Sequence, residues 1–374
     1  MKDLLNDIRF AIRALRRAPG FTAVVVLTLA LGIGANTAIF SVFRGVLLKP
    51  LPHRDGDRLV YLRQSADGPG RANLTFSVPE VRDLRNGVGA LSGLAEYSSW
   101  SAILQLKDGP MRLDLGLVTG NYFEVMGLSA ILGRVTRPGD DGPAAEPVMV
   151  LAYETWKTRF GGDTSIVGRH VSVNNTPATV IGVLQPAPFF PEQVHALMNM
   201  VISAHHVGAS MQDGRTHRMT EVVARLRPDA TVGQVRTEVD GVYSRLQNDF
   251  KEAYDPAAHY RVAVIPFRKV LGERAEQTLW LLMASAMFVL IVSAANVANL
   301  TLMRGVRREH ELVLRAALGA SAPTLRRLLL VENLVLAIAG AGIGMLIAAN
   351  GVGMLTTFAA RYSPRADEIG LDAS

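Results

Sequence analysis

The histidines and acids in the middle of the chain are the first candidates for chemistry. Four histidines occur near one another with two acids beside them: His195, His205, His206, His217, Asp213 and Glu221. A zinc site needs about four ligands at suitable spacing, which this arrangement lacks. The acidic pair Asp140-Asp141 lacks the ligand spacing of a calcium loop. We therefore interpret the histidines as exposed loop residues and predict no metal ligands.

Motifs for nucleotide hydrolysis and nucleophilic catalysis are also absent. The sequence has no Gly-Lys dipeptide, which excludes a phosphate-binding G-x-x-x-x-G-K-[ST] loop. It has neither H-E-x-x-H nor G-x-S-x-G. It has no cysteine, which excludes disulfides and a thiolate zinc site. The sequence therefore predicts no catalytic residues and no cofactor, and any ATP hydrolysis is expected from a separate subunit.

The polar stretch Arg304–Asn333 carries the clearest sign of a contact surface. Its pattern predicts a short helix from about Glu309 to Leu318, with Gly319 as its C-terminal cap and Ser321 as the N-cap of the next helix. A helix this short is not stable alone in water. Held between two long helices, it could present a rigid surface to a partner. The plainer interpretation is a basic loop that only joins the two helices.

The sequence contains three uncharged apolar stretches, of which two come before this polar segment and one comes after it. A bilayer core of roughly 30 Å needs ~20 apolar helical residues, and each stretch is longer than that: Phe21–Phe43, Thr278–Met303 and Asn333–Ala360. Three such stretches in a chain with 49% hydrophobic residues predict membrane spans rather than buried soluble helices. The first exceeds the roughly 7–15 apolar residues of a signal peptide, which favours a retained signal-anchor.

The charge distribution predicts an orientation. The net charge is +6, but residues 21–303 hold 26 of the 39 basic and 25 of the 33 acidic residues. The basic excess therefore lies beside the apolar stretches, as the positive-inside rule describes, and not in a nucleic-acid-binding surface. We expect the first twenty residues and residues 304–327 to be cytoplasmic, and the region between the first two spans to lie outside. No nucleic-acid partner is expected.

Residues 2–17 have an amphipathic pattern. Apolar residues share one helical face and arginines recur on another: Leu4, Leu5, Ile8, Ile12 and Leu15 against Arg9, Arg13 and Arg16. Such a helix can lie in the headgroup layer with its arginines near anionic lipid. Membrane lipid is therefore an expected partner. The alternative is an ordinary solvated basic flank.

The region of about residues 50–275 has mixed α/β patterning. Alternating segments predict strands at 59–64, in 101–110, in 111–120 and at 259–267, and a hairpin over 170–184 with its turn at Asn174-Asn175. A strand running into a helix is predicted at 147–156, and a strand, a turn and a helix across 220–250. Ser77 is the predicted N-cap of a further helix. The loops 138–147 and 185–192 could border an insertion. The predicted fold class is an α-helical membrane domain with three transmembrane helices plus an α+β periplasmic domain. That domain is expected to have two α/β units with a β-rich insertion.

Several segments together resemble one protein family. RREHELVLRAALGAS (307–321) is similar to the cytoplasmic loop of MacB-like/FtsX-like permeases of ABC transporters. The opening DIRFAIRALRRAPGF, with the apolar run after it, resembles the start of the multi-copy orphan permeases of that family. Segments 119–128, 156–175 and 224–239 resemble its periplasmic core domain. The resemblance covers nearly the whole chain.

The resemblance implies a cytoplasmic ABC ATPase as partner, and either a homodimer or pairing with a second permease half. The expected ATPase-coupling residues lie in the 304–327 loop: Arg308, Glu309, Glu311, Arg315, Ala317, Gly319 and Ala320. Polar and small residues inside the apolar stretches are candidates for contacts between transmembrane helices, because amides can bond across helices and glycines permit close approach. These are Asn36, Asn296, Asn299, Gly340 and Gly344.

The family has four spans in each unit, whereas this sequence shows three. The tail 361–374 resembles the approach to a fourth span. We therefore expect a truncated gene, a fragment, or the first part of a longer duplicated permease. The predicted domains are 1–20 (amphipathic helix), 21–44 (first span), 45–277 (periplasmic core domain), 278–303 (second span), 304–327 (coupling loop), 328–360 (third span) and 361–374 (periplasmic tail).

The expected function is that of a permease in the bacterial inner membrane, with its N-terminus in the cytoplasm and its large domain in the periplasm. It would couple a cytoplasmic ATPase to that domain for transport or mechanotransmission of an unassigned substrate. The alternative is a membrane-anchored periplasmic binding or scaffold protein without an ATPase. The lack of catalytic motifs disfavours a membrane enzyme.

Overall fold

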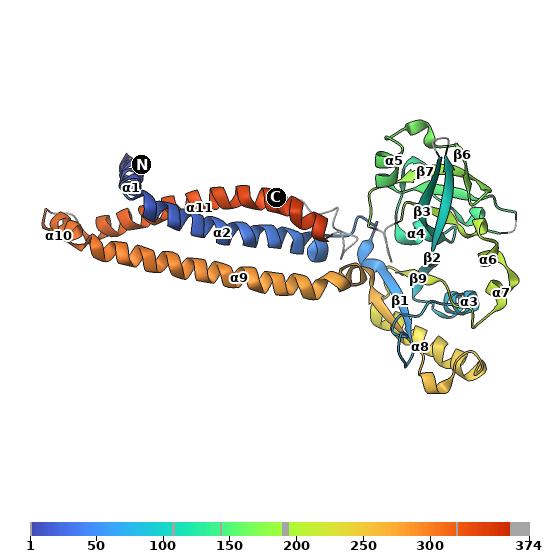
Figure 1. The fold of residues 1–374 in the computed structure, drawn as a ribbon. Helices are drawn as coiled ribbons and strands as arrows, with labels where there is room; N and C mark the ends of the chain where they lie inside the picture. The colour runs from blue at the N-terminus through green and yellow to red at the C-terminus, as the bar shows by residue number, and fades with distance from the viewer. Residues whose placement is uncertain (1, 107–108, 143, 189–193, 319–320, 360–374) are drawn as a thin grey trace. The chain divides into compact units, whose positions relative to one another are not determined.

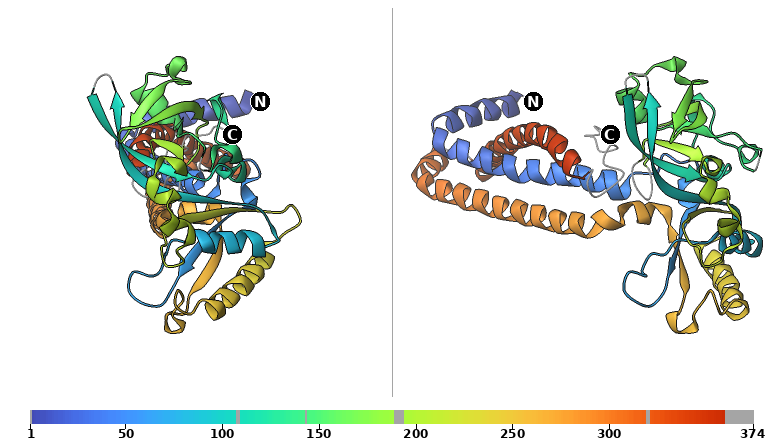
Figure 2. Two further views of the ribbon diagram at one scale, coloured as in Figure 1. Left: turned by 90° about the vertical axis from the view of Figure 1, so that its right-hand side faces the viewer. Right: turned by 45° about the vertical axis from the view of Figure 1, so that its right-hand side comes forward.

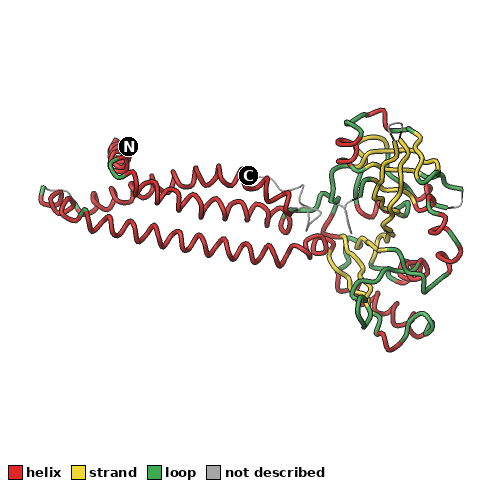
Figure 3. Tube along the Cα trace, in the orientation of Figure 1, coloured by secondary structure: helices red, strands yellow, loops and turns green. Residues whose placement is uncertain are grey.

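The computed structural model describes all residues except 1, 107–108, 143, 189–193, 319–320 and 360–374. The chain divides into two compact units. We call residues 1–49 with 272–374 the helical unit, and residues 50–271 the sheet unit. The strands of the described chain all belong to the sheet unit (Figure 3). The predicted tail and the coupling residues Gly319 and Ala320 lie outside the described residues.

The helical unit consists of three long helices and two shorter ones (Figure 1). These are α1 (Lys2–Arg16), α2 (Pro19–Phe43) with a π-helical turn (Arg44–Leu48), α9 (Phe267–Arg307, whose first residues belong to the sheet unit), α10 (Glu309–Ala317) and α11 (Ala322–Ala359). Pro19 stands at the first position of α2, where a proline without an N–H loses no hydrogen bond.

Three helices of the described chain are long and apolar enough to cross a membrane: Pro19–Leu48, Ala275–Arg307 and Ala322–Gly353. They coincide with the three predicted spans, although the last residue of the third predicted stretch, Ala360, is not described. Helix α9 begins 11 residues before the predicted span at Thr278. The preceding polar residues continue the helix because Arg, Lys, Glu and Gln are good helix formers.

Helices α2 and α9 run antiparallel. The Asn36 side chain of α2 donates a hydrogen bond of 2.6 Å to the Ala286 carbonyl oxygen of α9. Toward the end of α2, the Phe43 ring lies 4.9 Å from the Trp280 ring. At the start of α2, the Arg304 guanidinium lies 4.3 Å from the Phe21 ring centroid. The polar residues after Met303 therefore lie at the end of the pair where α2 begins.

Helices α2 and α11 run parallel and lie side by side, as Figure 1 and the right-hand view of Figure 2 show. Gly340 faces Leu29, and further along Gly344 faces Ala30. Ala38 then packs against Ala348 and Val352. Small residues at successive crossings allow the two backbones to approach closely, which maximises van der Waals contact where no hydrophobic driving force operates.

The sheet unit contains one mixed sheet in the order β10-β1-β9-β2-β3-β8-β5-β7-β4, with β6 paired to β2 and β7. The strands are β1 (Leu59–Ser65), β2 (Leu91–Leu106), β3 (Gly109–Val118), β4 (Ala130–Gly133), β5 (Val148–Leu151), β6 (His170–Val173), β7 (Thr176–Leu184), β8 (Ala196–Asn199), β9 (Glu221–Leu226) and β10 (Arg261–Pro266). The pairs β3–β8 and β5–β7 are parallel, and the other pairs in the described chain are antiparallel.

The described part of the sheet unit also contains helices, some of which pack on the sheet. They are α3 (Val78–Gly87), α4 (Tyr122–Met126), α5 (Tyr153–Arg159), α6 (Ala204–Val207), α7 (Ala209–Asp213) and α8 (Val232–Asp249). Short 3₁₀ turns occur at Gly56–Arg58, Pro138–Asp140, Thr164–Ile166, Met200–Ile202 and Pro256–Ala258. The predicted combination of three candidate membrane helices with an α+β domain is confirmed.

Helix α3 begins as its sequence predicts. Ser77 accepts a hydrogen bond from the Glu80 N–H, and the Glu80 carboxylate accepts one of 2.7 Å from the Ser77 N–H. This reciprocal arrangement is a capping box, which satisfies amide groups at a helix start. Here the box is buried, because Val81 and Leu84 of α3 pack into an apolar cluster with β1, β9 and α8.

The predicted hairpin at Asn174-Asn175 joins β6 to β7. Asn174 and Asn175 have φ values of 46° and 66°, in the left-handed region that a two-residue hairpin turn of type I′ requires. Asparagine tolerates this region better than most residues. The Asn174 side chain also accepts a hydrogen bond from the Ile103 N–H, which links the hairpin to β2.

Candidate functional site

A buried ion-pair cluster lies at the end of the helical unit where α2 begins. Arg304 and Arg308 project from the end of α9 and its continuation, and both reach Glu332 in α11. Their guanidinium nitrogens lie 2.8 Å and 3.0 Å from the Glu332 carboxylate. Glu332 is 7% exposed. A carboxylate buried this deeply is stable only when it is paired, so this cluster fixes α9 against α11.

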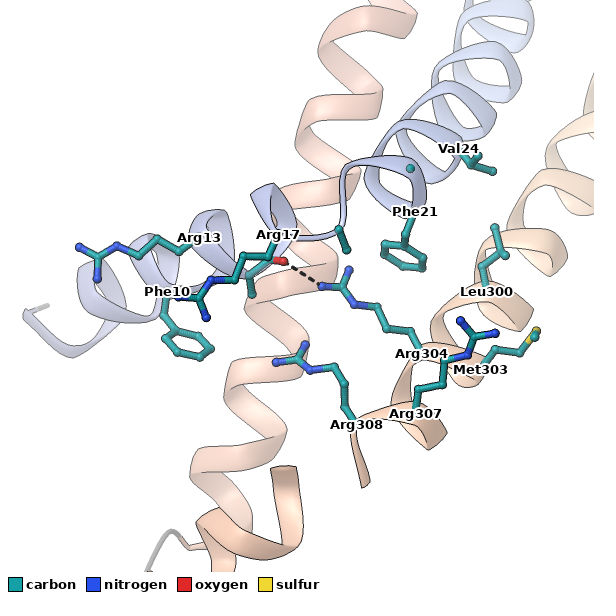
Figure 4. A pocket seen from close by; sticks show the side chains of 13 residues that line it. Phe10, Arg13, Arg17, Phe21, Val24, Leu300, Met303, Arg304, Arg307 and Arg308 are labelled. Atoms are coloured by element: carbon teal, nitrogen blue, oxygen red, sulfur yellow. Dashed lines mark hydrogen bonds between the residues drawn. The ribbon is translucent and has the colours of Figure 1, made fainter. Parts of the chain in front are cut away.

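Arg304 also connects α9 to the first two helices. Its guanidinium donates a hydrogen bond of 3.2 Å to the Ala14 carbonyl oxygen of α1, as the dashed line in Figure 4 shows. The same group stacks near the Phe21 ring, a favourable cation–π arrangement. Arg304 therefore contacts side chains or backbone groups from α1, α2 and α11.

A second ion pair ties α1 to α11. An Arg327 nitrogen lies 2.7 Å from an Asp7 carboxylate oxygen. On the same helix α1, Leu15 packs with Val25 and Leu336 in one buried cluster. Helix α1 is therefore held by one charged and one apolar contact. It packs against other helices of the helical unit, whereas a solvated basic flank would make no such contacts.

Helix α10 occupies the polar segment between α9 and α11. It covers Glu309–Ala317, close to the predicted extent. Val313 and Leu314 are 61% and 64% exposed, and Leu318 just beyond the helix is 88% exposed. Among the predicted coupling residues, Arg308 belongs to the ion-pair cluster, while Glu309 and Ala317 are exposed. Glu311 and Arg315 belong to α10.

Three of the predicted helix-contact residues lie between helices. Asn36 bonds to α9, as described above. A Cβ atom added at Gly340 would lie 2.6 Å from the Leu29 Cβ. One added at Gly344 would lie 2.9 Å from the Ala30 carbonyl oxygen. Both glycines therefore stand where no larger residue fits without moving a helix.

Asn296 and Asn299 occupy a different position. Both are exposed on α9. Among the hydrogen bonds of the described residues, none joins either side chain to α2 or α11. On the same helix, Ser293 is buried and its side chain faces Gly32 of α2. The helix-contact face of α9 therefore includes Ser293 and leaves Asn296 and Asn299 on another face.

Replacing Gly344 by valine should destabilise the helical unit by about 1–3 kcal/mol, because the new side chain would overlap backbone atoms of α2 that cannot rotate away. The midpoint of thermal unfolding of the full chain in detergent measures this loss. Gly342→Val is a matched control on the same helix, since nothing lies within 4 Å of a Cβ at Gly342. An equal shift for both variants would contradict the close-contact explanation.

Several described histidines of the sheet unit lie close together. His205 and His217 are in contact, with 3.1 Å between their Nε2 atoms. Burial and the neighbouring His205 lower the pKa of His206 to about 4. Its burial corrects our interpretation of the histidines as exposed loop residues, because His206 packs within the short α6 helix and bonds to Ser203. Among the described residues, no group of three His, Cys, Asp or Glu could hold a metal ion.

Glu96 is a buried acid of the sheet unit that is paired with an arginine. Burial raises the pKa of Glu96 to about 7, although the Arg85 guanidinium 3.4 Å away opposes this shift. Glu96 lies in β2 and Arg85 in α3, so their contact joins a strand to a helix that packs beside it.

The central residue of the site, Glu332, was not among the predicted site residues. A sequence signal for it existed: it is the single acid immediately before a long uncharged stretch, and ionisable residues at such positions are usually paired. Its two partners, however, lie 24 and 28 positions earlier, across α10. The Asp7–Arg327 pair joins residues 320 positions apart, and no local pattern indicates it.

Comparisons with known proteins identify relatives of this chain. The model of the MacB-like periplasmic core domain matches residues 22–242. The macrolide export ATP-binding/permease protein MacB of Azoarcus sp. (strain BH72) is 24% identical, over 96% of this chain and 53% of the relative. The pyoverdine export ATP-binding/permease protein PvdT of Pseudomonas syringae pv. syringae (strain B728a) is 23% identical, over 94% and 52%. The chain thus spans about half the length of these curated relatives.

A solved structure is also similar. The periplasmic region of MacB from Actinobacillus actinomycetemcomitans is 17% identical, with a TM-score of 0.44, over 64% of this chain and 97% of that one.

The fold and the site together define a class: a permease-type membrane protein whose α/β domain is inserted between its first two candidate spans. The family match covers more than half of the chain. The protein therefore belongs to the MacB-like periplasmic core domain family of ABC transporter permeases, as the sequence resemblance predicts.

Proposed function

We propose that this chain is the permease part of an ABC-type export or mechanotransmission complex in the bacterial inner membrane. In this proposal α1 and the 304–327 segment are cytoplasmic, and the domain predicted at 45–277 is periplasmic. The antiparallel course of α2 and α9 supports it, because both chain connections to the sheet unit, at Lys49 and Gly272, then leave the membrane on one side. The positive-inside rule supports the assignment of sides.

The observation that carries the proposal is α10. It is a short helix whose apolar residues Val313 and Leu314 are exposed, although it adjoins a polar cluster at the end of the bundle. Exposed apolar residues with charged neighbours are typical of protein interaction surfaces. We propose that a cytoplasmic ABC ATPase binds here, with Glu309, Glu311, Arg315 and Ala317 among its contacts.

Helix α9 offers a route for the coupling. It continues without a break for 41 residues, from β10 to Arg307. Its first residues Phe267 and Leu271 are buried in the core of the sheet unit. An ATP-driven displacement of α10 would therefore act through Arg308 on α9, and through α9 on the residues packed around Phe267. A shift between two arrangements biased by nucleotide is the physical form of such coupling.

The relatives named for macrolide and pyoverdine export combine an ATP-binding and a permease function in their names. We propose the same class of activity for the complete assembly that contains this chain, with the cargo unassigned. A homodimer or a pair with a second permease half would cover the exposed amides of Asn296 and Asn299, which lipid chains cannot satisfy.

A single introduced cysteine tests both the side of the membrane on which α10 lies and the proposed binding of an ATPase to α10, because the natural chain has no cysteine. In spheroplasts, Leu314→Cys should react with a membrane-impermeant maleimide only after permeabilisation. A maleimide photocrosslinker at the same position should capture a P-loop ATPase. Val207→Cys, an exposed site in α6, is the matched control and should be labelled in intact spheroplasts without capturing an ATPase.

Labelling of Leu314→Cys from outside would reject the proposed orientation. Correct labelling without any ATPase adduct, in cells that express their ABC ATPases, would favour the membrane-anchored scaffold instead.

A further inference from the structure

A strongly cationic pocket lies between α1, the start of α2 and the end of α9. Its volume is about 740 Å³. Five arginines are among its described lining residues, and no acid is: Arg13, Arg17, Arg304, Arg307 and Arg308. In Figure 4, the side chains of Arg17, Arg304 and Arg308 lie around one space, whereas Arg13 extends away from it and Arg307 lies beside Met303.

The arginines at the sides of this pocket lack a counterion within the described chain. No carboxylate of the described residues lies within ion-pair distance of Arg13, Arg17 or Arg307. Arg13 and Arg17 are four positions apart on neighbouring turns, where like charges repel. Arg304 and Arg308 share the Glu332 carboxylate, so the unbalanced positive charge of the pocket comes from Arg13, Arg17 and Arg307. The repulsion among these cations raises the free energy of the folded helical unit, and an anion bound in the pocket would lower it.

The rest of the lining is apolar. Phe10, Phe21, Val24, Leu300 and Met303 border the same pocket. Val24 and Met303 are 51% and 57% exposed, and they belong to candidate spans. Val24 lies about 7 Å along the axis from the start of α2 at a rise of 1.5 Å per residue. The pocket therefore changes from guanidinium groups to hydrocarbon within roughly the depth of a lipid headgroup region.

We infer that this pocket binds the phosphate headgroup of an anionic phospholipid. The guanidinium groups of Arg17, Arg304 and Arg308 would contact the phosphate, since arginine donates paired hydrogen bonds to phosphate oxygens. The first part of an acyl chain would lie along Val24, Leu300 and Met303. An acidic protein surface would match the arginines but would make no use of these apolar side chains, so the composition of the pocket favours a lipid.

The bound lipid would act as a further link between α1, α2 and α9. Arg13 and Arg17 belong to the segment before α2, whereas Arg304 and Arg307 end α9. A single phosphate in contact with both groups would hold α1 at the membrane surface beside the coupling segment. This inference requires that the spans cross a membrane but not that an ATPase binds α10, so the two proposals can fail separately.

Native mass spectrometry of the full chain in detergent tests the inference directly. The probes are phosphatidylglycerol and phosphatidylcholine with the same acyl chains. We expect preferential retention of phosphatidylglycerol. The triple variant Arg13→Gln, Arg17→Gln, Arg307→Gln should lower that affinity by about tenfold or more, because each cation near a membrane surface contributes ~1 kcal/mol.

The matched control is Arg9→Gln, Arg16→Gln, Arg326→Gln, which removes the same charge from exposed positions that do not line the pocket. It should retain the lipid. A third variant with lysine at positions 13, 17 and 307 should keep most of the preference, which separates loss of charge from loss of folding.

Three outcomes would overturn the inference. Equal retention by the triple variant and the natural chain would show that the pocket does not hold the lipid. An equal loss in the control would indicate a diffuse attraction. Displacement of phosphatidylglycerol by inorganic phosphate alone would assign the pocket to a free anion.

Discussion

Replacing Glu80 by alanine should cost about 3–5 kcal/mol of the free energy of unfolding of the sheet unit. Glu80 is fully buried, and its carboxylate is the shared acceptor of an internal network. The donors are the Ser77 N–H and hydroxyl, the Gln64 amide, the Tyr243 and Tyr254 hydroxyls, and the Arg218 guanidinium. Alanine would leave these buried donors without their acceptor and would also remove half of the capping box.

Arg218 makes the loss larger than that of a neutral hydrogen-bond network. Its side chain is 14% exposed and lies 3.4 Å from Glu80, and its guanidinium carbon lies 5.3 Å and 5.1 Å from the ring centroids of Tyr254 and Tyr260. Without the carboxylate, a buried cation would remain uncompensated, which is the most costly outcome of breaking a buried ion pair. Hydrogen exchange of the α3 and β1 backbone amides in the full chain measures the resulting loss of stability.

The chain offers a matched control for this prediction. Thr231 and Gln234 form a second capping box with the same reciprocal bonds at the start of α8, but that box is exposed. Gln234→Ala should therefore cost only about 1 kcal/mol. If Glu80→Ala costs no more than Gln234→Ala, capping alone accounts for Glu80 and the buried network contributes nothing measurable.

Replacing Glu332 by alanine should destabilise the helical unit by about 3–5 kcal/mol. The change would deprive Arg304 and Arg308 of the carboxylate that both contact near the bundle end. Because these arginines fix α9 against α11, we expect a lower midpoint of thermal unfolding in detergent. We also expect faster proteolysis near α10, since its two flanking helices would lose their charged connection.

Glu309→Gln removes the same charge from an exposed position one residue beyond Arg308, so it should change the free energy of unfolding by less than about 0.5 kcal/mol. Substitution of Arg304, Arg308 and Glu332 together by apolar residues should recover part of the loss, because an apolar set can replace a buried ion pair. A harmless Glu332→Ala variant would instead show that the cluster is open to water in the membrane.

Those features of the molecule that depend on local chemistry could be predicted from the sequence. The three candidate spans follow from the length of their uncharged runs, and α10 follows from its position between two of them. Ser77 and Glu80 define the start of α3, and Asn174-Asn175 define a hairpin turn, because each needs only a few neighbouring residues.

The features that could not be predicted depend on how distant elements face one another. Asn36 and Asn296 look equivalent as polar residues in apolar runs, yet one bonds across helices and the other is exposed, since the rotation of α9 decides it. Strand β8 lies between β3 and β5 because of pairings that no short segment encodes. The pocket arginines likewise come from two segments nearly 300 positions apart.

The unequal packing of the three long helices has a consequence for sequence divergence. Over its apolar stretch α9 has 11% of its residues buried, against 33% for α2 and 28% for α11. Hydrocarbon accepts any aliphatic side chain of similar size, whereas the crossings at Gly34 and Gly344 accept only the smallest residues. Distant members of the family should therefore keep small residues in register along α2 and α11, while the outward face of α9 drifts freely among apolar residues.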